Sequence, residues 1–251
     1  STNLTRGECG VAKITVARDR EMILVEAPRV GLPVPPDFLS RDLPGPAFRM
    51  LAGNVAYLKL SQARAADIAG YLVSASRVKF KRREAAAKEF VVFELAGRLV
   101  SEATPFAKFL VPSLASPGEF FFTSPIELRP LEPRFTGKVV ALIDESTMSQ
   151  TEYTAMALRA AGATLIGSPS AGADGNVSQV DLPGGLRFML SGIGVFSPDG
   201  QATQGVGLIP DILTVPSIDG VRDCRDELLE AAVLHLADAS VPSEKDVAIC
   251  R

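Results

Sequence analysis

The sequence has no apolar stretch long enough to cross a membrane as a helix, so we expect no membrane span. The formal net charge is only −3, which provides no basic surface for nucleic acid. The three cysteines, Cys9, Cys224 and Cys250, do not have the spacing of metal ligands, and the single histidine is His235. No Gly-Lys-Ser/Thr motif follows any glycine-rich loop, which excludes a Walker-type nucleotide site. We therefore expect neither a metal nor a cofactor.

The composition is that of a globular chain, because 47% of its 251 residues are hydrophobic and 22% are charged. Two β-like runs, Ile14–Ala17 and Met22–Glu26, flank a charged turn and predict a β-hairpin. Six prolines lie within residues 28–46, which indicates an extended linker. We predict a hairpin segment at 1–27, a proline-rich linker at 28–46 and a core domain at 47–251.

Residues 137–179 carry the clearest pattern in the chain. The apolar run Val139–Ile143 predicts a strand buried on both faces, and Ala163–Ile166 predicts a second strand. Apolar residues at helical spacing lie between them, so the segment predicts a strand–helix–strand crossover in a parallel sheet. Ser149 stands where the first strand leads into the helix.

Ser149 has two interpretations at this position. Ser149-Gln-Thr-Glu152 fits a capping box, with serine at the N-cap and glutamate at N3. A nucleophile is the alternative, because the first N–H groups of a helix can stabilise an oxyanion during acyl transfer. The Gly-x-Ser-x-Gly motif of the α/β-hydrolases is absent, so that family is not indicated.

Five motifs follow one another in the order seen in the S41 peptidases, which include the tail-specific or C-terminal processing proteases and their tricorn-like relatives. They are Val140-Ala-Leu-Ile-Asp…Ser149-Gln-Thr-Glu152, Gly167-Ser-Pro-Ser-Ala-Gly172, Leu182-Pro-Gly-Gly185, Ser197-Pro-Asp-Gly200 and Gly207-Leu-Ile-Pro-Asp211. The chain resembles this family over roughly residues 45–235.

The resemblance implies an α/β fold, the ClpP/crotonase-like sandwich of stacked ββα units, preceded by a hairpin that resembles the last strands of a PDZ-like domain. It also implies Ser149 as the nucleophile, the Gln150 N–H as an oxyanion donor, a polypeptide substrate and an extracytoplasmic location. Glycine-rich loops let a substrate backbone approach closely, so we assign Gly172, Ala173, Gly184 and Gly185 to substrate binding.

The general base is where the chain departs from the family. The tail-specific branch carries its catalytic lysine in the loop after Gly167, where this chain has Ala173 or Asp174. Tricorn-like members carry their histidine on a strand equivalent to residues 54–60, where this chain has Lys59. We take Lys59, Asp174 and Asn176 as candidates for activating or orienting Ser149.

A second departure lies at residues 77–89. Lys79, Lys81, Arg82 and Arg83 make this segment strongly basic, where the family has a buried strand followed by a glycine-bearing oxyanion loop. Because buried charges need partners, we expect no buried parallel strand here.

We therefore predict an S41-like serine peptidase with impaired activity. The alternatives are a non-catalytic peptide-binding module and, more distantly, a crotonase-like acyl-CoA enzyme. The oligomeric state stays open.

Overall fold

The computed structural model describes residues 10–18, 21–29, 45–51, 54–59, 67–68, 77–80 and 89–236. The chain divides into two compact units, residues 1–40 and 41–251, and this division lies inside the predicted linker. In the first unit, β1 (Gly10–Arg18) pairs antiparallel with β2 (Glu21–Arg29), which confirms the predicted hairpin. The strand β2 extends beyond the predicted boundary at residue 27. The relation to a PDZ-like domain stays a prediction.

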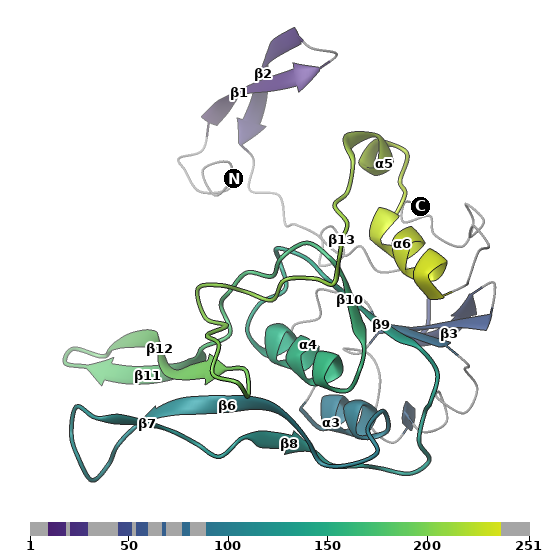
Figure 1. The fold of residues 1–251 in the computed structure, drawn as a ribbon. Helices are drawn as coiled ribbons and strands as arrows, with labels where there is room; N and C mark the ends of the chain where they lie inside the picture. The colour runs from purple at the N-terminus through teal and green to yellow at the C-terminus, as the bar shows by residue number, and fades with distance from the viewer. Residues whose placement is uncertain are drawn as a thin grey trace. The chain divides into compact units, whose positions relative to one another are not determined.

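A six-stranded sheet forms the centre of the second unit (Figure 1). Its strand order is β13-β10-β9-β5-β4-β3, and all neighbours are parallel except β3 and β4. The strands are β3 (Phe48–Leu51), β4 (Val55–Leu58), β5 (Arg77–Phe80), β9 (Val139–Ile143), β10 (Thr164–Gly167) and β13 (Ile212–Leu213). Helix α4 (Gln150–Ala160) joins β9 to β10, so the predicted parallel crossover is confirmed.

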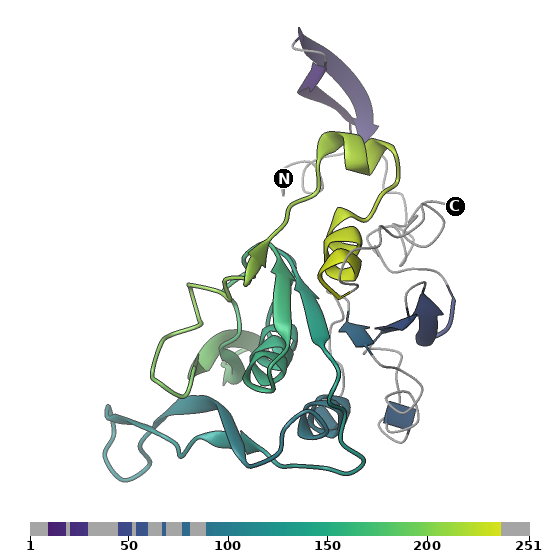
Figure 2. The same cartoon turned by 45° about the vertical axis from the view of Figure 1, so that its right-hand side comes forward.

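Both faces of this sheet are covered, which explains why β9 is wholly apolar. All five of its residues are buried. Val139, Ala141 and Ile143 belong to one core cluster with α4, while Val140 and Leu142 belong to another with α6 (Glu227–Leu236). Successive strand side chains point to opposite faces, so helices on both sides require apolar residues at every position. Figure 2 shows the two helices on either side of β9 and β10.

A second, antiparallel sheet packs beyond α4 and α3 (Glu89–Gly97), with strand order β11-β12-β6-β7 and β8 paired to β6. Phe106, Leu128 and Val195 of this sheet share a core cluster with Leu95 and Ala155 of the two helices. The motif Leu182-Pro-Gly-Gly185 lies at the turn of a hairpin, in which β11 pairs antiparallel with β12. The strands are β6 (Thr104–Pro112), β7 (Phe120–Phe122), β8 (Ile126–Leu128), β11 (Asn176–Leu182) and β12 (Leu186–Phe196).

One sequence-based expectation needs correction. We predicted no buried parallel strand within residues 77–89, yet residues 77–80 form β5, which pairs in parallel with both β4 and β9. The parallel pairing over these four residues was therefore not expected. The pairing depends on backbone groups, and Val78 and Phe80 have high β-propensity. The rest of that segment, residues 81–88, lies outside the described residues.

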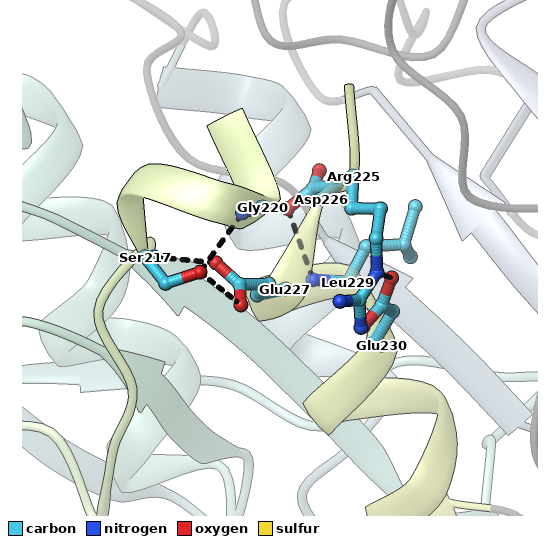
Figure 3. A network of polar contacts seen from close by, with 7 residues as sticks. All are labelled: Ser217, Gly220, Arg225, Asp226, Glu227, Leu229 and Glu230. Carbon is cyan, nitrogen blue, oxygen red and sulfur yellow. Dashed lines mark hydrogen bonds and ion pairs between the residues drawn. The ribbon is translucent and has the colours of Figure 1, made fainter. Parts of the chain in front are cut away.

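The C-terminal part of the second unit is held together by a polar network between α5 (Ile218–Arg222) and α6 (Figure 3). The Glu227 carboxylate accepts hydrogen bonds from the Ser217 N–H (2.5 Å) and hydroxyl (2.8 Å). The Ser217 hydroxyl also accepts from the Gly220 N–H at 2.9 Å, which caps α5. Cys224 lies between the two helices and is disulfide-bonded; Cys9 and Cys250 lie outside the described residues.

Candidate active site

Ser149 lies at the junction of β9 and α4, as predicted, and it is exposed. Its backbone angles are φ 54° and ψ −128°, a region that residues with a side chain rarely adopt. Such a conformation costs about 1–3 kcal/mol and persists only where the surrounding structure imposes it. A nucleophilic serine on a strained strand-to-helix turn has its hydroxyl held out from the backbone in the same way.

Ser149 is also part of a capping box. It stands at the N-cap with Glu152 at N3, and the Glu152 carboxylate accepts from the Ser149 N–H at 3.2 Å. The Glu152 N–H also donates to the Ser149 carbonyl at 2.9 Å. The capping interpretation therefore holds, and it does not conflict with a second role for this exposed serine at the pocket.

Glu152 anchors the loop that follows β10. This side chain is fully buried, and each of its carboxylate oxygens accepts hydrogen bonds. Oε1 accepts from the Gly172 N–H at 2.8 Å and from the Ser170 hydroxyl. Oε2 accepts from the Ala173 N–H at 2.8 Å and from the Ser149 N–H at 3.2 Å. One carboxylate thus fixes the turn at Ser149 and the neighbouring loop to each other.

The loop itself is closely packed. Gly172 has a φ of 66°, and a Cβ atom there would lie 2.9 Å from the Gly207 nitrogen, so only glycine fits. The Ala173 carbonyl accepts from the Ser149 N–H at 2.9 Å, and the Gly172 carbonyl accepts from the Gly205 N–H at 2.7 Å. The backbone groups of Gly172 and Ala173 are therefore engaged within the protein and shape the wall of the site.

A pocket of about 270 Å³ opens beside Ser149. One side of it is apolar, and within that side the Phe109 and Tyr153 rings stack with their centroids 6.1 Å apart. The other side is polar and contains a hydroxyl, a carboxylate and two carboxamides. Eight residues line the pocket: Phe109, Ile126, Ser149, Gln150, Tyr153, Asp174, Asn176 and Val195.

Asp174 is the only carboxylate in this lining, and its side chain is 5% exposed. Neither of its buried oxygens has a hydrogen-bond partner among the residues that the structure describes. The neighbouring Thr203 hydroxyl donates to the Val195 carbonyl at 2.9 Å. Burial raises the pKa of the Asp174 carboxyl, the charge of Glu152 raises it further, and the Thr203 hydroxyl opposes both effects.

Gln150 provides the donors of the pocket. It is the first residue of α4, and the first N–H groups of a helix have no partner within that helix. Its side-chain Nε2 is also buried without a hydrogen-bond partner in the described part of the chain. A bound group with a carbonyl or oxyanion would meet unpaired donors here.

Of the remaining predicted site residues, only Asn176 lines the pocket. The Lys59 Nζ is part-buried and donates to the Gly45 carbonyl at 3.0 Å. Gly184 and Gly185 form the turn between β11 and β12, at the end of β11 opposite Asn176. Six residue steps along β11 correspond to roughly 20 Å, so these glycines lie well away from the pocket.

Three features of the site were not predicted from the sequence. The backbone strain at Ser149 has no sequence signal, because serine is not selected for positive φ. Glu152 was interpreted only as a helix-capping residue, although it also binds the loop twenty residues later. Gln204 holds this loop by accepting from the Gly175 N–H at 2.6 Å, and its place shortly before Gly207 was the only signal for it.

The comparisons with known proteins agree with this architecture. The family model named Peptidase family S41 matches residues 60–214, which is more than half of the 251 residues. A search of curated proteins found no match.

Similar solved structures support the same fold. One is a putative peptidase from Parabacteroides merdae, with a TM-score of 0.65 and 19% identity, covering 75% of this chain and 63% of that one. Another is mature CPAF complexed with lactacystin, with a TM-score of 0.62 and 13% identity, covering 82% and 63%. A third is the photosystem II D1 C-terminal processing protease, with a TM-score of 0.55 and 14% identity, covering 91% and 58%.

This chain therefore spans less than two thirds of the length of each of these structures. The identities are low, so these likenesses concern the fold, which is the α/β fold of the S41 core as predicted. The family assignment depends on the match of the family model to more than half of the sequence. This chain belongs to peptidase family S41.

Proposed function

We propose that this chain is a serine peptidase that hydrolyses polypeptides, with Ser149 as the nucleophile and Asp174 as the general base. One observation carries this proposal. An exposed serine on a strained strand-to-helix turn shares a pocket with a buried carboxylate whose oxygens have no partner among the described residues. Buried polar groups are normally paired, so a buried carboxylate without a hydrogen-bond partner beside an exposed serine favours a catalytic role over a purely structural one.

The chemistry follows from these groups. The Ser149 Oγ attacks the scissile carbonyl carbon, and its proton passes to Asp174. The Gln150 N–H, at the positive end of α4, donates to the developing oxyanion. The C–N bond then breaks, and the leaving amine takes the proton from Asp174. Water hydrolyses the resulting Ser149 ester by the same proton transfers in reverse.

The raised pKa of Asp174 is relevant to the first step. A general base is most effective when its pKa lies near the working pH, and burial moves this carboxyl in that direction. A carboxylate is still a weaker base than the lysine or histidine of related peptidases, so we expect slow turnover. The neutral Asn176 cannot accept the proton, and we assign it to orienting the substrate.

The test is covalent labelling by a fluorophosphonate probe combined with hydrolysis of fluorescein-labelled casein. The probe should label Ser149, as identified by mass spectrometry of the digested protein, and Ser149→Ala should abolish both labelling and hydrolysis. Ser101→Ala removes another exposed serine and serves as the matched control. Hydrolysis that survives in Ser149→Ala would refute the nucleophile. Casein binding without labelling would favour the non-catalytic peptide-binding module.

We further propose an extracytoplasmic location. Disulfide bonds persist in oxidising compartments, and Cys224 is disulfide-bonded. Across the described ranges, none of the helices is long and apolar enough to span a membrane.

A further inference from the structure

The β11–β12 hairpin extends beyond the sheet to which it belongs. Strand β12 pairs with β6 only through Gly194, Val195 and Phe196. Within the described part of the chain, residues 177–182 and 186–191 pair only with each other. We call residues 177–191 the arm; Figure 1 shows it reaching away from α4. A two-stranded hairpin is marginally stable by itself, so the arm contributes little to the stability of the fold. This suggests that the arm has a function other than stabilising the fold.

The two faces of the arm differ. Val180 pairs with Phe188 and Leu182 with Leu186, so these four side chains lie on one face together with Leu190. Their exposed fractions range from 41% for Leu190 to 66% for Leu186, so the apolar face is open to solvent. The opposite face carries the ion pair between Arg187 and Asp181 (3.0 Å) together with Val177, Gln179, Met189 and Ser191.

The apolar face is continuous with the pocket beside Ser149. Along β11, Asn176 lies on the same side as Val180 and Leu182, because alternate residues share a face. The register shifts between Asn176 and Val177, because β12 has one extra residue at this point. Ile193 therefore pairs with Asn176, and Val195 lies on the same face of the hairpin as Asn176. Asn176 and Val195 both line the pocket. One side of the hairpin therefore runs from the tip of the arm to the pocket beside Ser149, apolar near the tip and polar at Ser178 and Asn176.

We propose that the apolar face of the arm is a docking surface for an extended polypeptide substrate with apolar side chains, which it guides to Ser149. This inference rests on the proposed peptidase function in one respect, namely that the bound substrate continues from the arm into the pocket at Ser149. This side of the hairpin, from Leu182 to Asn176, is roughly 20 Å long, which accommodates about six residues of extended chain. A folded partner could cover the arm but could not continue into a pocket of about 270 Å³, whereas an extended chain fits both.

The test compares neighbouring residues on opposite faces. Leu186→Ser/Phe188→Ser removes apolar side chains from the docking face, and Met189→Ser, 65% exposed, makes the same kind of change on the other face. The probe is reduced, carboxymethylated casein labelled with fluorescein. We expect the double variant to raise KM about tenfold, since it loses the favourable burial that Phe188 and Leu186 would gain on binding. The value of kcat, fluorophosphonate labelling and the Met189→Ser variant should be unchanged.

Binding to Ser149→Ala, followed by fluorescence anisotropy, separates this inference from the peptidase function. If the wild type is not labelled but casein binding is still weakened about tenfold by the Leu186/Phe188 changes, the docking surface stands and the peptidase proposal fails. Equal binding by both arm variants would overturn the docking surface. A dimer in light scattering that the double variant converts to monomer, with KM unchanged, would also overturn it, because a second copy would then cover the face.

Discussion

Glu152 and Asp174 are two buried carboxylates next to the loop after β10, and they differ in their hydrogen-bond partners. Glu152 accepts hydrogen bonds at both oxygens, from the turn at Ser149 and from the loop after β10. Asp174 has no such partners among the described residues and faces the pocket. A buried charge with donors around it stabilises structure, whereas one without them destabilises the fold and is retained where chemistry needs it. This difference indicates a structural role for Glu152 and supports the proposal of a catalytic role for Asp174.

The largest effect should come from Asp174→Asn. This near-isosteric change removes the proposed base, and general-base catalysis is worth about 10²- to 10⁴-fold. We expect casein hydrolysis to fall by that factor while the variant folds normally. The check is the hydrolysis rate alongside circular dichroism. A variant that hydrolyses casein at the wild-type rate would remove Asp174 from the mechanism.

Glu152→Ala should mainly reduce the free energy of unfolding, whereas Asp174→Asn should mainly reduce the hydrolysis rate. Removing the carboxylate leaves several buried donors unpaired, each at about 1–3 kcal/mol, so we expect a loss of about 3 kcal/mol or more. Urea unfolding measures this loss. The control is Glu145→Ala, which removes an exposed carboxylate that accepts from Ser168 (3.1 Å) and should cost under about 1 kcal/mol. Equal losses in the two variants would contradict the structural role of Glu152.

The dependence of stability on pH should separate the same two residues. The folded-state pKa of Asp174 is raised, so the native protein holds this proton more tightly than the unfolded chain. Its ionisation therefore destabilises the fold as pH rises through the raised pKa, and the cost disappears as pH falls below the ordinary aspartate pKa. We expect Asp174→Asn to have a higher Tm than the wild type at pH 8, with the difference shrinking toward pH 4. A constant difference would argue against the raised pKa.

The smallest effect should come from Lys59→Met. Lys59 is buried but does not line the pocket, and its Nζ bonds to the Gly45 carbonyl. Losing this bond should cost about 1 kcal/mol of stability, with labelling of Ser149 changed less than about twofold. A loss of labelling beyond tenfold would instead move the general base from Asp174 to Lys59.

The parts predicted from the sequence are those with a local pattern. The apolar run of β9, the spacing in α4 and the glycine turn of the β11–β12 hairpin each depend on neighbours in the chain. They identified the crossover, and the order of five motifs identified the family. Ser149 was located for the same reason, since it stands at the predicted junction.

The rest depends on contacts between distant segments. β5 was missed because its basic residues were weighed individually, while its place between β4 and β9 is set by backbone pairing. The contrast between Glu152 and Asp174 is equally invisible in sequence. Both are acidic residues, and only the folded chain surrounds Glu152 with several donors while leaving Asp174 with the Thr203 hydroxyl alone to lower its pKa.

The most direct test of the Ser149–Asp174 pair is the rate of fluorophosphonate labelling as a function of pH, in the wild type and in Asp174→Asn. The account predicts that the wild-type rate rises with pH as Asp174 ionises, at a pKa above the ordinary aspartate range, and then levels off. In Asp174→Asn the rate should be lower and should not show this rise. An identical rate and pH profile in the two proteins would contradict the assignment of Asp174 as the base that activates Ser149.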